Sequence, residues 1–148
     1  MKYLYFFILV FAIFVTNAQV TGSTPYRLQF GINQVVSGSG ANWKITNTDD
    51  YDIVIAIVDL YDEVVAHAYI KKNESYMFKD LPIGSYSYKF KSGSKFFEDK
   101  KFTKFDGCDP EVYVCDGRPQ WTMNVWVERS SNSIGESGKI SEDDFFEN

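Results

Sequence analysis

The sequence is poor in the residues that build catalytic and metal centres. Its 148 residues include one histidine, His67, and two cysteines, Cys108 and Cys115. Two cysteines cannot form a zinc site alone, and their spacing is too long for a C-x-x-C redox motif. A lone histidine in the apolar residues 64–69 is typical of a structural residue, so we expect no metal and no cofactor. The alternative is a small hydrolase in which His67 belongs to a Ser-His-Asp triad, although no serine stands in a G-x-S-x-G elbow.

Long apolar runs are also missing after the first residues. One unbroken apolar run, residues 3–15, follows Lys2, and small residues then stand at the two positions of residues 16–18 that a signal peptidase reads. This pattern predicts a cleavable secretory signal peptide over residues 1–18. An uncleaved anchor is the alternative, but a spanning helix needs about 20 apolar residues. We therefore expect a periplasmic, secreted or cell-surface protein that begins at Gln19 and has no stable membrane insertion.

Export predicts the state of the two cysteines, and the net charge indicates which classes of partner to expect. Outside the cytoplasm an even pair indicates a structural disulfide, so we expect a Cys108–Cys115 bridge, with free or catalytic thiols as the alternative. The chain has 15 Lys and Arg against 20 Asp and Glu, a net charge of −5. An acidic protein gains little from a polyanion, so nucleic acid is not an expected partner.

Two acidic segments, residues 49–52 and 106–109, have oxygens that calcium could use. Neither has the length or the closing glutamate of an EF-hand loop. Both are more typical of turns whose aspartates cap strands, which is the interpretation we favour.

Strand patterns dominate the rest of the chain. Residues 53–58 are apolar at every position, which predicts a central strand covered on both faces. Residues 84–91 alternate, with three aromatic side chains on a buried face and serines and lysines on a face exposed to water. Residues 95–105 are aromatic and basic with poor alternation, which predicts a bulged or edge strand. Further strands are predicted at residues 26–32, 43–47, 64–70, 112–115 and 121–129.

The C-terminus completes the predicted architecture. Ser141 and the three acids after it resemble a helix N-cap, and Phe145 and Phe146 would dock on the domain, which predicts a short C-terminal helix or hook. About seven to nine short strands and no amphipathic helix predict an all-β fold, an antiparallel Greek-key β-sandwich. We assign the sandwich to residues 19–135 and an acidic C-terminal tail or hook to residues 136–148.

The turn before the alternating strand carries a resemblance to a known family. Leu81, Gly84 and Tyr86 have the spacing of a tyrosine corner, in which the tyrosine hydroxyl bonds to a backbone group upstream. Residues 78–86 resemble prealbumin-like domains (also called transthyretin-like or carboxypeptidase regulatory-like), and look closest to small secreted Bacteroidota-type proteins. The resemblance covers residues 43–105. It implies a Greek-key module that binds, braces or presents rather than catalyses.

Trp126 is the binding residue that the strand pattern indicates. In residues 121–129 the alternation puts Trp126 on the opposite face from Val125. A tryptophan on a wet face can stack on a sugar or anchor a protein partner. We expect instead that Phe145 and Phe146 of the C-terminal hook cover this tryptophan, and exposure is the alternative.

Lysines gather along residues 89–104 and give a second candidate surface. Such a strip could attract an acidic glycan or an anionic lipid, with Lys95, Lys100 and Lys101 as contacts. Lysines on an edge strand more often prevent sheet-to-sheet pairing, and we favour that interpretation. The strip consists of Lys89, Lys91, Lys95, Lys100, Lys101 and Lys104.

These patterns lead to one functional hypothesis with two alternatives. The hypothesis is a secreted or periplasmic, non-catalytic module that binds a protein or glycan partner of the cell envelope. A periplasmic inhibitor or immunity-like protein is the first alternative, because small, acidic, exported domains suit that role. The hydrolase that uses His67 is the second.

Overall fold

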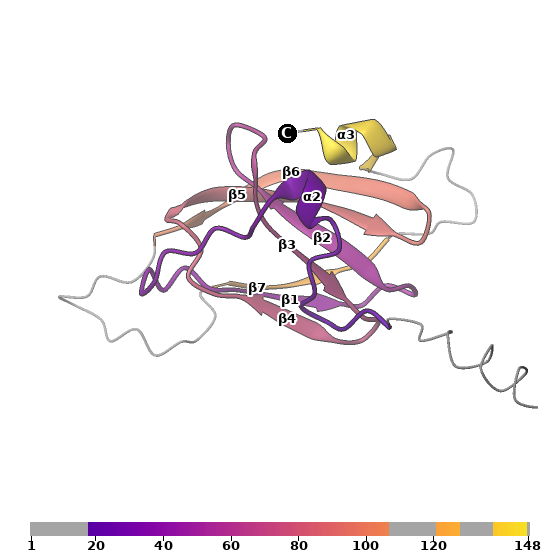
Figure 1. The fold of residues 1–148 in the computed structure, drawn as a ribbon, viewed down its shortest axis with the longest axis horizontal. Coiled ribbons are helices and arrows are strands. Elements are labelled where there is room, and N and C mark those ends of the chain that lie inside the picture. Colours follow the sequence, from indigo (N-terminus) through magenta and orange to yellow (C-terminus); the bar gives the residue numbers. More distant parts are fainter. Residues whose placement is uncertain (1–17, 107–120, 128–137, 148) are drawn as a thin grey trace, which may run out of the picture.

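The computed structural model describes residues 18–106, 121–127 and 138–147. In these residues the chain forms eight strands and two short helices, labelled as in Figure 1. The strands build two sheets that pack face to face, and a short helix ends the described chain (Figure 1). The predicted all-β fold with a C-terminal helix is therefore confirmed. The predicted strand at residues 112–115 lies outside the described residues, as do both cysteines and residues 1–17.

The smaller sheet has three strands in the order β4-β1-β7. The central strand β1 (Trp43–Asn47) pairs antiparallel with β4 (Ser75–Phe78) and parallel with β7 (Trp121–Val125). Along β1 the odd residues are buried and Lys44 is exposed. One face of this sheet therefore joins the core, and the other face meets water.

The larger sheet is antiparallel throughout and has five strands in the order β3-β2-β5-β6-β8. The strand β2 lies between β3 and β5, and all six of its residues are buried, as its unbroken apolar run predicted. The register between β5 and β6 shifts between Tyr86 and Tyr88, so β6 is the predicted bulged strand. The bounds are β2 (Ile53–Val58), β3 (Val64–Ile70), β5 (Gly84–Ser92), β6 (Lys95–Phe105) and β8 (Lys139–Ile140).

The core between the sheets is apolar and closed by the turn before β5. Leu81 is 1% exposed, and the Tyr86 hydroxyl donates to the Pro82 carbonyl at 2.6 Å. A Cβ on Gly84 would lie 3.2 Å from this hydroxyl, so the ring packs directly over the glycine. The tyrosine thus satisfies a backbone oxygen of the turn that the buried ring would otherwise exclude from water.

The outer face of the five-stranded sheet is covered by helices from both ends of the described chain. Figure 1 shows α2 (Arg27–Phe30) and α3 (Glu142–Phe146) on the side of this sheet away from the smaller sheet. The Ser141 hydroxyl accepts the Asp144 amide, and the Asp144 carboxylate accepts the Ser141 amide, a complete capping box. Phe30 and Phe145 are buried there, with ring centroids 5.5 Å apart.

This cover corrects two predictions. The strand predicted at residues 26–32 is wrong, because Tyr26 and Phe30 stand one helical turn apart and pack edge to face in the aromatic cluster beneath α3. The wet face predicted for residues 84–91 is also wrong. Ser87 and Lys89 are buried there, because the Lys89 ammonium lies under α3 and donates to the carbonyls of Asp144 and Glu147 at 3.0 and 2.8 Å.

The N-terminal segment, residues 18–36, closes the outer edge of β3. An edge strand presents unpaired amides and carbonyls to solvent, which invites pairing with other chains. Here the outward backbone groups of three alternate β3 residues, Val65, His67 and Tyr69, and of Lys71 just after the strand are bonded to this segment. The bonds are Gln34 N to Val65 O, Asn33 Nδ2 to His67 O, His67 N to Asn33 Oδ1, Gly22 N to Tyr69 O, Tyr69 N to Ser23 O and Lys71 N to Thr21 Oγ1, all between 2.8 and 3.0 Å.

Candidate functional site

Trp126 is exposed, with 60% of its surface accessible. The prediction that Phe145 and Phe146 cover it is wrong. Because β8 pairs with the outer edge of β6, the chain that follows carries α3 over the outer face of the larger sheet. Phe145 therefore packs against Phe96 on that face, at 5.0 Å between ring centroids, rather than against the residues after β7.

Beside Trp126 the sandwich opens between β6 and β7. The two strands are joined at one end, where the Trp121 indole donates to the Lys104 carbonyl at 2.9 Å. Toward the other end they leave a groove of about 420 Å³, which we call the Trp126 groove. Three aromatic side chains of the larger sheet line it, with residues of and after β7 opposite. The lining residues are Tyr88, Phe90, Phe97, Glu98, Asp99, Asn124, Trp126, Val127 and Gly138.

A second hollow of about 380 Å³ adjoins the groove and shares Phe97 and Val127 with it. Its other lining residues include Tyr51, which is 55% exposed, and Lys95. The structure thus places two of the predicted contacts, Trp126 and Lys95, along one continuous surface with an exposed aromatic ring in each part. Sequence reasoning missed Tyr51, because it lies in a turn without any strand pattern.

Two polar groups of the Trp126 groove, Tyr88 and Asp99, are held in place before any ligand arrives. Asp99 accepts the Tyr88 hydroxyl at 3.2 Å and the Lys101 amide at 2.9 Å. Burial, together with the negative charge of Asp99, raises the pKa of Tyr88 to about 12, so this phenol stays protonated and donates. Asn124, which is exposed on β7, adds an amide with donors and acceptors. The groove therefore combines aromatic faces with oriented hydrogen-bonding groups.

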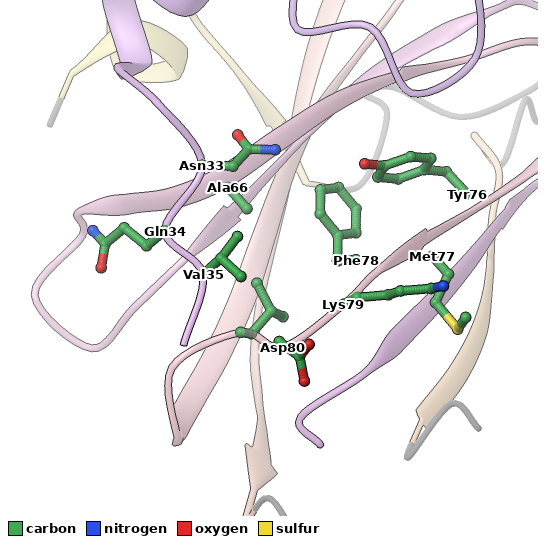
Figure 2. A pocket seen from close by; sticks show the side chains of 10 residues that line it. Asn33, Gln34, Val35, Ala66, Tyr76, Met77, Phe78, Lys79 and Asp80 are labelled. Carbon is green, nitrogen blue, oxygen red and sulfur yellow. The ribbon is translucent and has the colours of Figure 1, made fainter. Parts of the chain in front are cut away.

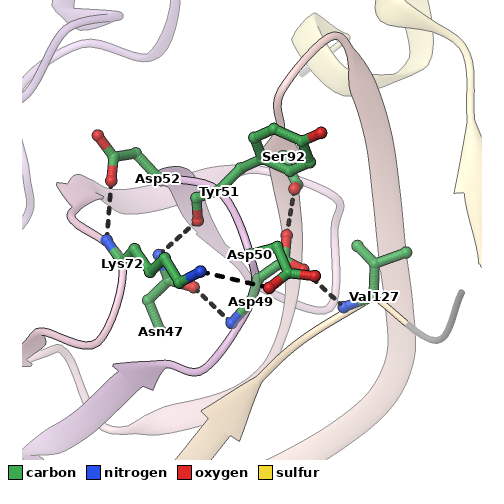
Figure 3. A network of polar contacts seen from close by, with 8 residues as sticks. All are labelled: Asn47, Asp49, Asp50, Tyr51, Asp52, Lys72, Ser92 and Val127. Atoms are coloured by element: carbon green, nitrogen blue, oxygen red, sulfur yellow. Dashed lines mark hydrogen bonds and ion pairs between the residues drawn. The ribbon is translucent and has the colours of Figure 1, made fainter.

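A buried polar network fixes the far end of this surface (Figure 3). Asn47 donates to the carbonyls of Tyr51 and Ile70 at 2.9 and 3.0 Å and accepts the Asp49 amide at 3.0 Å. Asp49, 2% exposed, accepts the Ser92 hydroxyl and the Val127 amide. The network therefore ties the turn that carries Tyr51 to the chain that carries Trp126.

The structure describes residues 49–52 in full but only one residue of the second acidic segment, residues 106–109. Residues 49–52 act as turn residues, because Asp52 accepts the Lys72 amide at 2.8 Å and Asp49 belongs to the network of Figure 3. Of the other segment only Asp106 is described, and it pairs with Lys104 at 2.7 Å. Among the described residues, no group of three or more His, Cys, Asp or Glu side chains is placed to hold a metal ion.

The six lysines do not form one strip. Lys89 is buried under α3, and the Lys91 ammonium donates to the Tyr26 hydroxyl at 3.0 Å on the covered outer face. Lys100 is exposed and pairs with Glu98 at 3.1 Å, and Lys101 is exposed close to it on β6. Among the described residues β8 pairs with Phe96 and Phe97, and the Glu98 amide donates to the Gly138 carbonyl. No described strand pairs with the outer side of β6 beyond Glu98, and exposed lysines there suit edge protection.

His67 lies beneath the N-terminal segment. It is 1% exposed, its ring is 5.3 Å from that of Phe30, and no described residue forms a hydrogen bond with either ring nitrogen. Burial lowers the pKa of His67, and the nearby Thr24 backbone opposes this shift in part. The geometry gives the imidazole no access to a substrate, which favours the structural interpretation over the hydrolase.

Compared with protein-family models, curated proteins and solved structures, the chain matches none. The resemblance to prealbumin-like domains therefore stays a prediction, and the Cys108–Cys115 bridge lies outside the described residues. In the part of the chain that the structure describes, no helix is both long enough and apolar enough to cross a membrane.

Proposed function

We propose that this protein is an exported, non-catalytic binding module whose Trp126 groove holds a glycan of the cell envelope. The observation that carries the proposal is the exposed Trp126 beside the hydrogen-bonded Tyr88 and Asp99 and the exposed amide of Asn124. Export is part of the proposal and is supported by the signal-peptide pattern of residues 1–18.

This groove is better suited to a glycan ligand than to a flat surface of a protein partner. The apolar face of a sugar ring stacks on an aromatic side chain, while its hydroxyls need donors and acceptors at the rim. The groove and the adjoining hollow offer an exposed ring at each end, Trp126 and Tyr51, which is suited to a chain of sugars rather than to one. A protein anchor would need a larger apolar patch around the tryptophan, with its polar groups at the rim.

The arrangement of acids supports binding rather than cleavage. Glycoside hydrolysis needs two carboxyl groups that flank one bond. Glu98 and Asp99 are neighbours on a strand, so their side chains point to opposite faces. Asp99 is bonded to Tyr88 and Glu98 is paired with Lys100, so each already has a protein partner.

Retention on envelope polysaccharide tests the proposal. The protein is isolated from the cell envelope, where its first residue should be Gln19, and is titrated with solubilised envelope polysaccharide. Trp126→Ala should weaken binding at least about tenfold, because it removes the stacking surface. Tyr61→Ala is the matched control, since Tyr61 is an exposed aromatic residue (85% accessible) outside both hollows.

Two results would contradict the proposal. Equal binding by wild type and Trp126→Ala would remove the groove from the interaction. One stoichiometric protein partner, retained when no polysaccharide is, would favour the inhibitor or immunity-like alternative.

A further inference from the structure

The strand β4 is an edge of the smaller sheet. No described strand lies on its outer side, although Gly22 of the N-terminal segment lies against the Tyr76 ring. It pairs with β1 on one side only, in the order β4-β1-β7. Asn47 N donates to Glu74 O at 2.9 Å, which makes this pair a hydrogen-bonded pair of the β1–β4 ladder. Hydrogen-bonded pairs alternate along an antiparallel ladder, so Tyr76 and Phe78 bond to β1, whereas the backbone groups of Ser75 and Met77 face away from it.

These outward groups have no partner in the described chain. No hydrogen bond joins the backbone of Ser75 or Met77 to any described residue beyond the β1–β4 ladder. The two residues stand two positions apart, the spacing at which a neighbouring strand places its own amides and carbonyls. The edge is therefore complementary to one more extended chain.

A hollow of about 370 Å³ lies alongside this edge. Figure 2 shows Asn33 and Val35 of the N-terminal segment on one side of it and the rings of Tyr76 and Phe78 on the other. Phe78 and Ala66 are buried at its base, whereas Val35 is 64% exposed at its rim. A strand that pairs with β4 would place alternate side chains beside this hollow, where apolar ones would be buried.

Two other edges of the sandwich, those of β3 and β6, are protected against such pairing. The β3 edge is bonded to the N-terminal segment, as described above. The exposed part of β6 is bulged and carries lysines, two devices that prevent strand addition. By contrast β4, with the sequence Ser-Tyr-Met-Phe, has no charge, no proline and no bulge.

We propose that the β4 edge binds an extended segment of a partner polypeptide by strand addition, with an apolar side chain of that segment in the hollow. A second copy of this chain fits less well. If β4 paired with its own copy, Tyr76 and Phe78 would stay in their own core, and the hollow of each copy would stay empty. A separate peptide can both bond to the outward backbone groups and fill the hollow with a side chain. This is the mode of peptide recognition called strand addition.

The test uses a capped peptide, Lys-Val-Thr-Val-Thr-Val-Lys, added to the full mature chain and followed by the amide chemical shifts of the protein. Its control is the same peptide with alternate amides N-methylated, which blocks the donors along one edge. We expect the unmethylated peptide to shift the amides of Ser75 and Met77 and to slow their hydrogen exchange. The amides of β6 should stay unchanged.

Two pairs of variants locate the binding. Met77→Pro removes an outward donor, which an edge strand tolerates, and should weaken peptide binding roughly three- to tenfold with the fold intact. Tyr76→Pro should instead break the β1–β4 ladder and unfold the edge, which checks the assignment of the outward groups. Val35→Asp should weaken binding by placing a charge at the rim, whereas Val36→Asp, 50% exposed and outside the hollow, should not.

These results test strand addition separately from glycan binding, because the Trp126 groove is on the opposite side of the sandwich. If millimolar peptide moves no β4 amide, or if Met77→Pro binds the peptide as wild type does, the proposal fails. A concentration-dependent dimer that Met77→Pro abolishes would replace the partner peptide with a second copy.

Discussion

The two long sides of the sandwich differ in how they are closed. On the β3 side the N-terminal segment bonds to the backbone of alternate strand residues, and α2 and α3 cover the adjoining outer face. On the β6–β7 side the described residues are joined by one indole-to-carbonyl bond, and beside it lies the Trp126 groove. The closed side uses aromatic residues for stability, whereas the open side leaves Trp126 in water, where a ligand can reach it.

Removing Phe30 should have the largest effect on the closed side. Phe30→Ala deletes a buried ring that packs against His67, Phe145 and Phe146, so we expect a loss of about 3–5 kcal/mol in the free energy of unfolding. Leu28→Ala is the matched control on the same helix, because Leu28 is 98% exposed and should change stability by less than about 0.5 kcal/mol. Urea denaturation measures both. Equal stabilities of the two variants would show that α2 does not hold the closed side.

Asn33→Ala should open the β3 edge at one point, with a smaller effect. The Asn33 side chain bonds to both the amide and the carbonyl of His67, and truncation leaves two buried backbone groups without partners. We expect a loss of about 2 kcal/mol and faster hydrogen exchange at the His67 amide. Gln34→Ala is the control, since the bond from Gln34 to Val65 uses the backbone and survives. An unchanged exchange rate in Asn33→Ala would contradict the edge closure.

The smallest effect should come from the protonation of His67 in mild acid. Burial puts the pKa of the folded state below the ordinary value of 6.5, so the unfolded chain binds more protons between those two values. Stability should therefore fall as pH decreases through that window, by up to about 1.4 kcal/mol per pH unit. In His67→Leu this part of the pH dependence should disappear, as urea denaturation between about pH 8 and pH 5 would show. The same pH dependence in both proteins would mean that another group is responsible.

Local signals predicted the parts of the fold that depend on neighbouring residues. The unbroken apolar run of β2 indicated a strand buried on both faces, and Ser141 with the acids after it indicated the capped helix α3. The turn before β5 likewise predicted the bond of the Tyr86 hydroxyl, because all its partners lie within six residues of sequence. Each of these signals acts through residues close in the chain.

Structural features that depend on residues distant in sequence could not be predicted from local patterns. Lys89 looks solvated from its alternation with aromatic residues, and only the position of α3 shows that it is buried. Trp126 was assigned to the correct face of its strand, but its exposure depends on where β8 directs the C-terminus. The strand β4 was missed because four residues are too few for a clear period. Its alternation of Tyr76 and Phe78 was the one signal available.

The meeting of the chain ends on one sheet has a consequence for the order of folding. Tyr26 and Phe30 near the beginning contact Phe145 and Phe146 at the end, with ring centroids 4.9 Å apart between Tyr26 and Phe146. A contact between residues so far apart in sequence forms late, because the loop that it closes costs the most chain entropy. During synthesis Tyr26 and Phe30 therefore cannot form these contacts until Phe145 and Phe146 have been added to the chain. Until α3 has been synthesised, this part of the outer face of the larger sheet stays uncovered, so the domain cannot reach its full stability before that helix is in place.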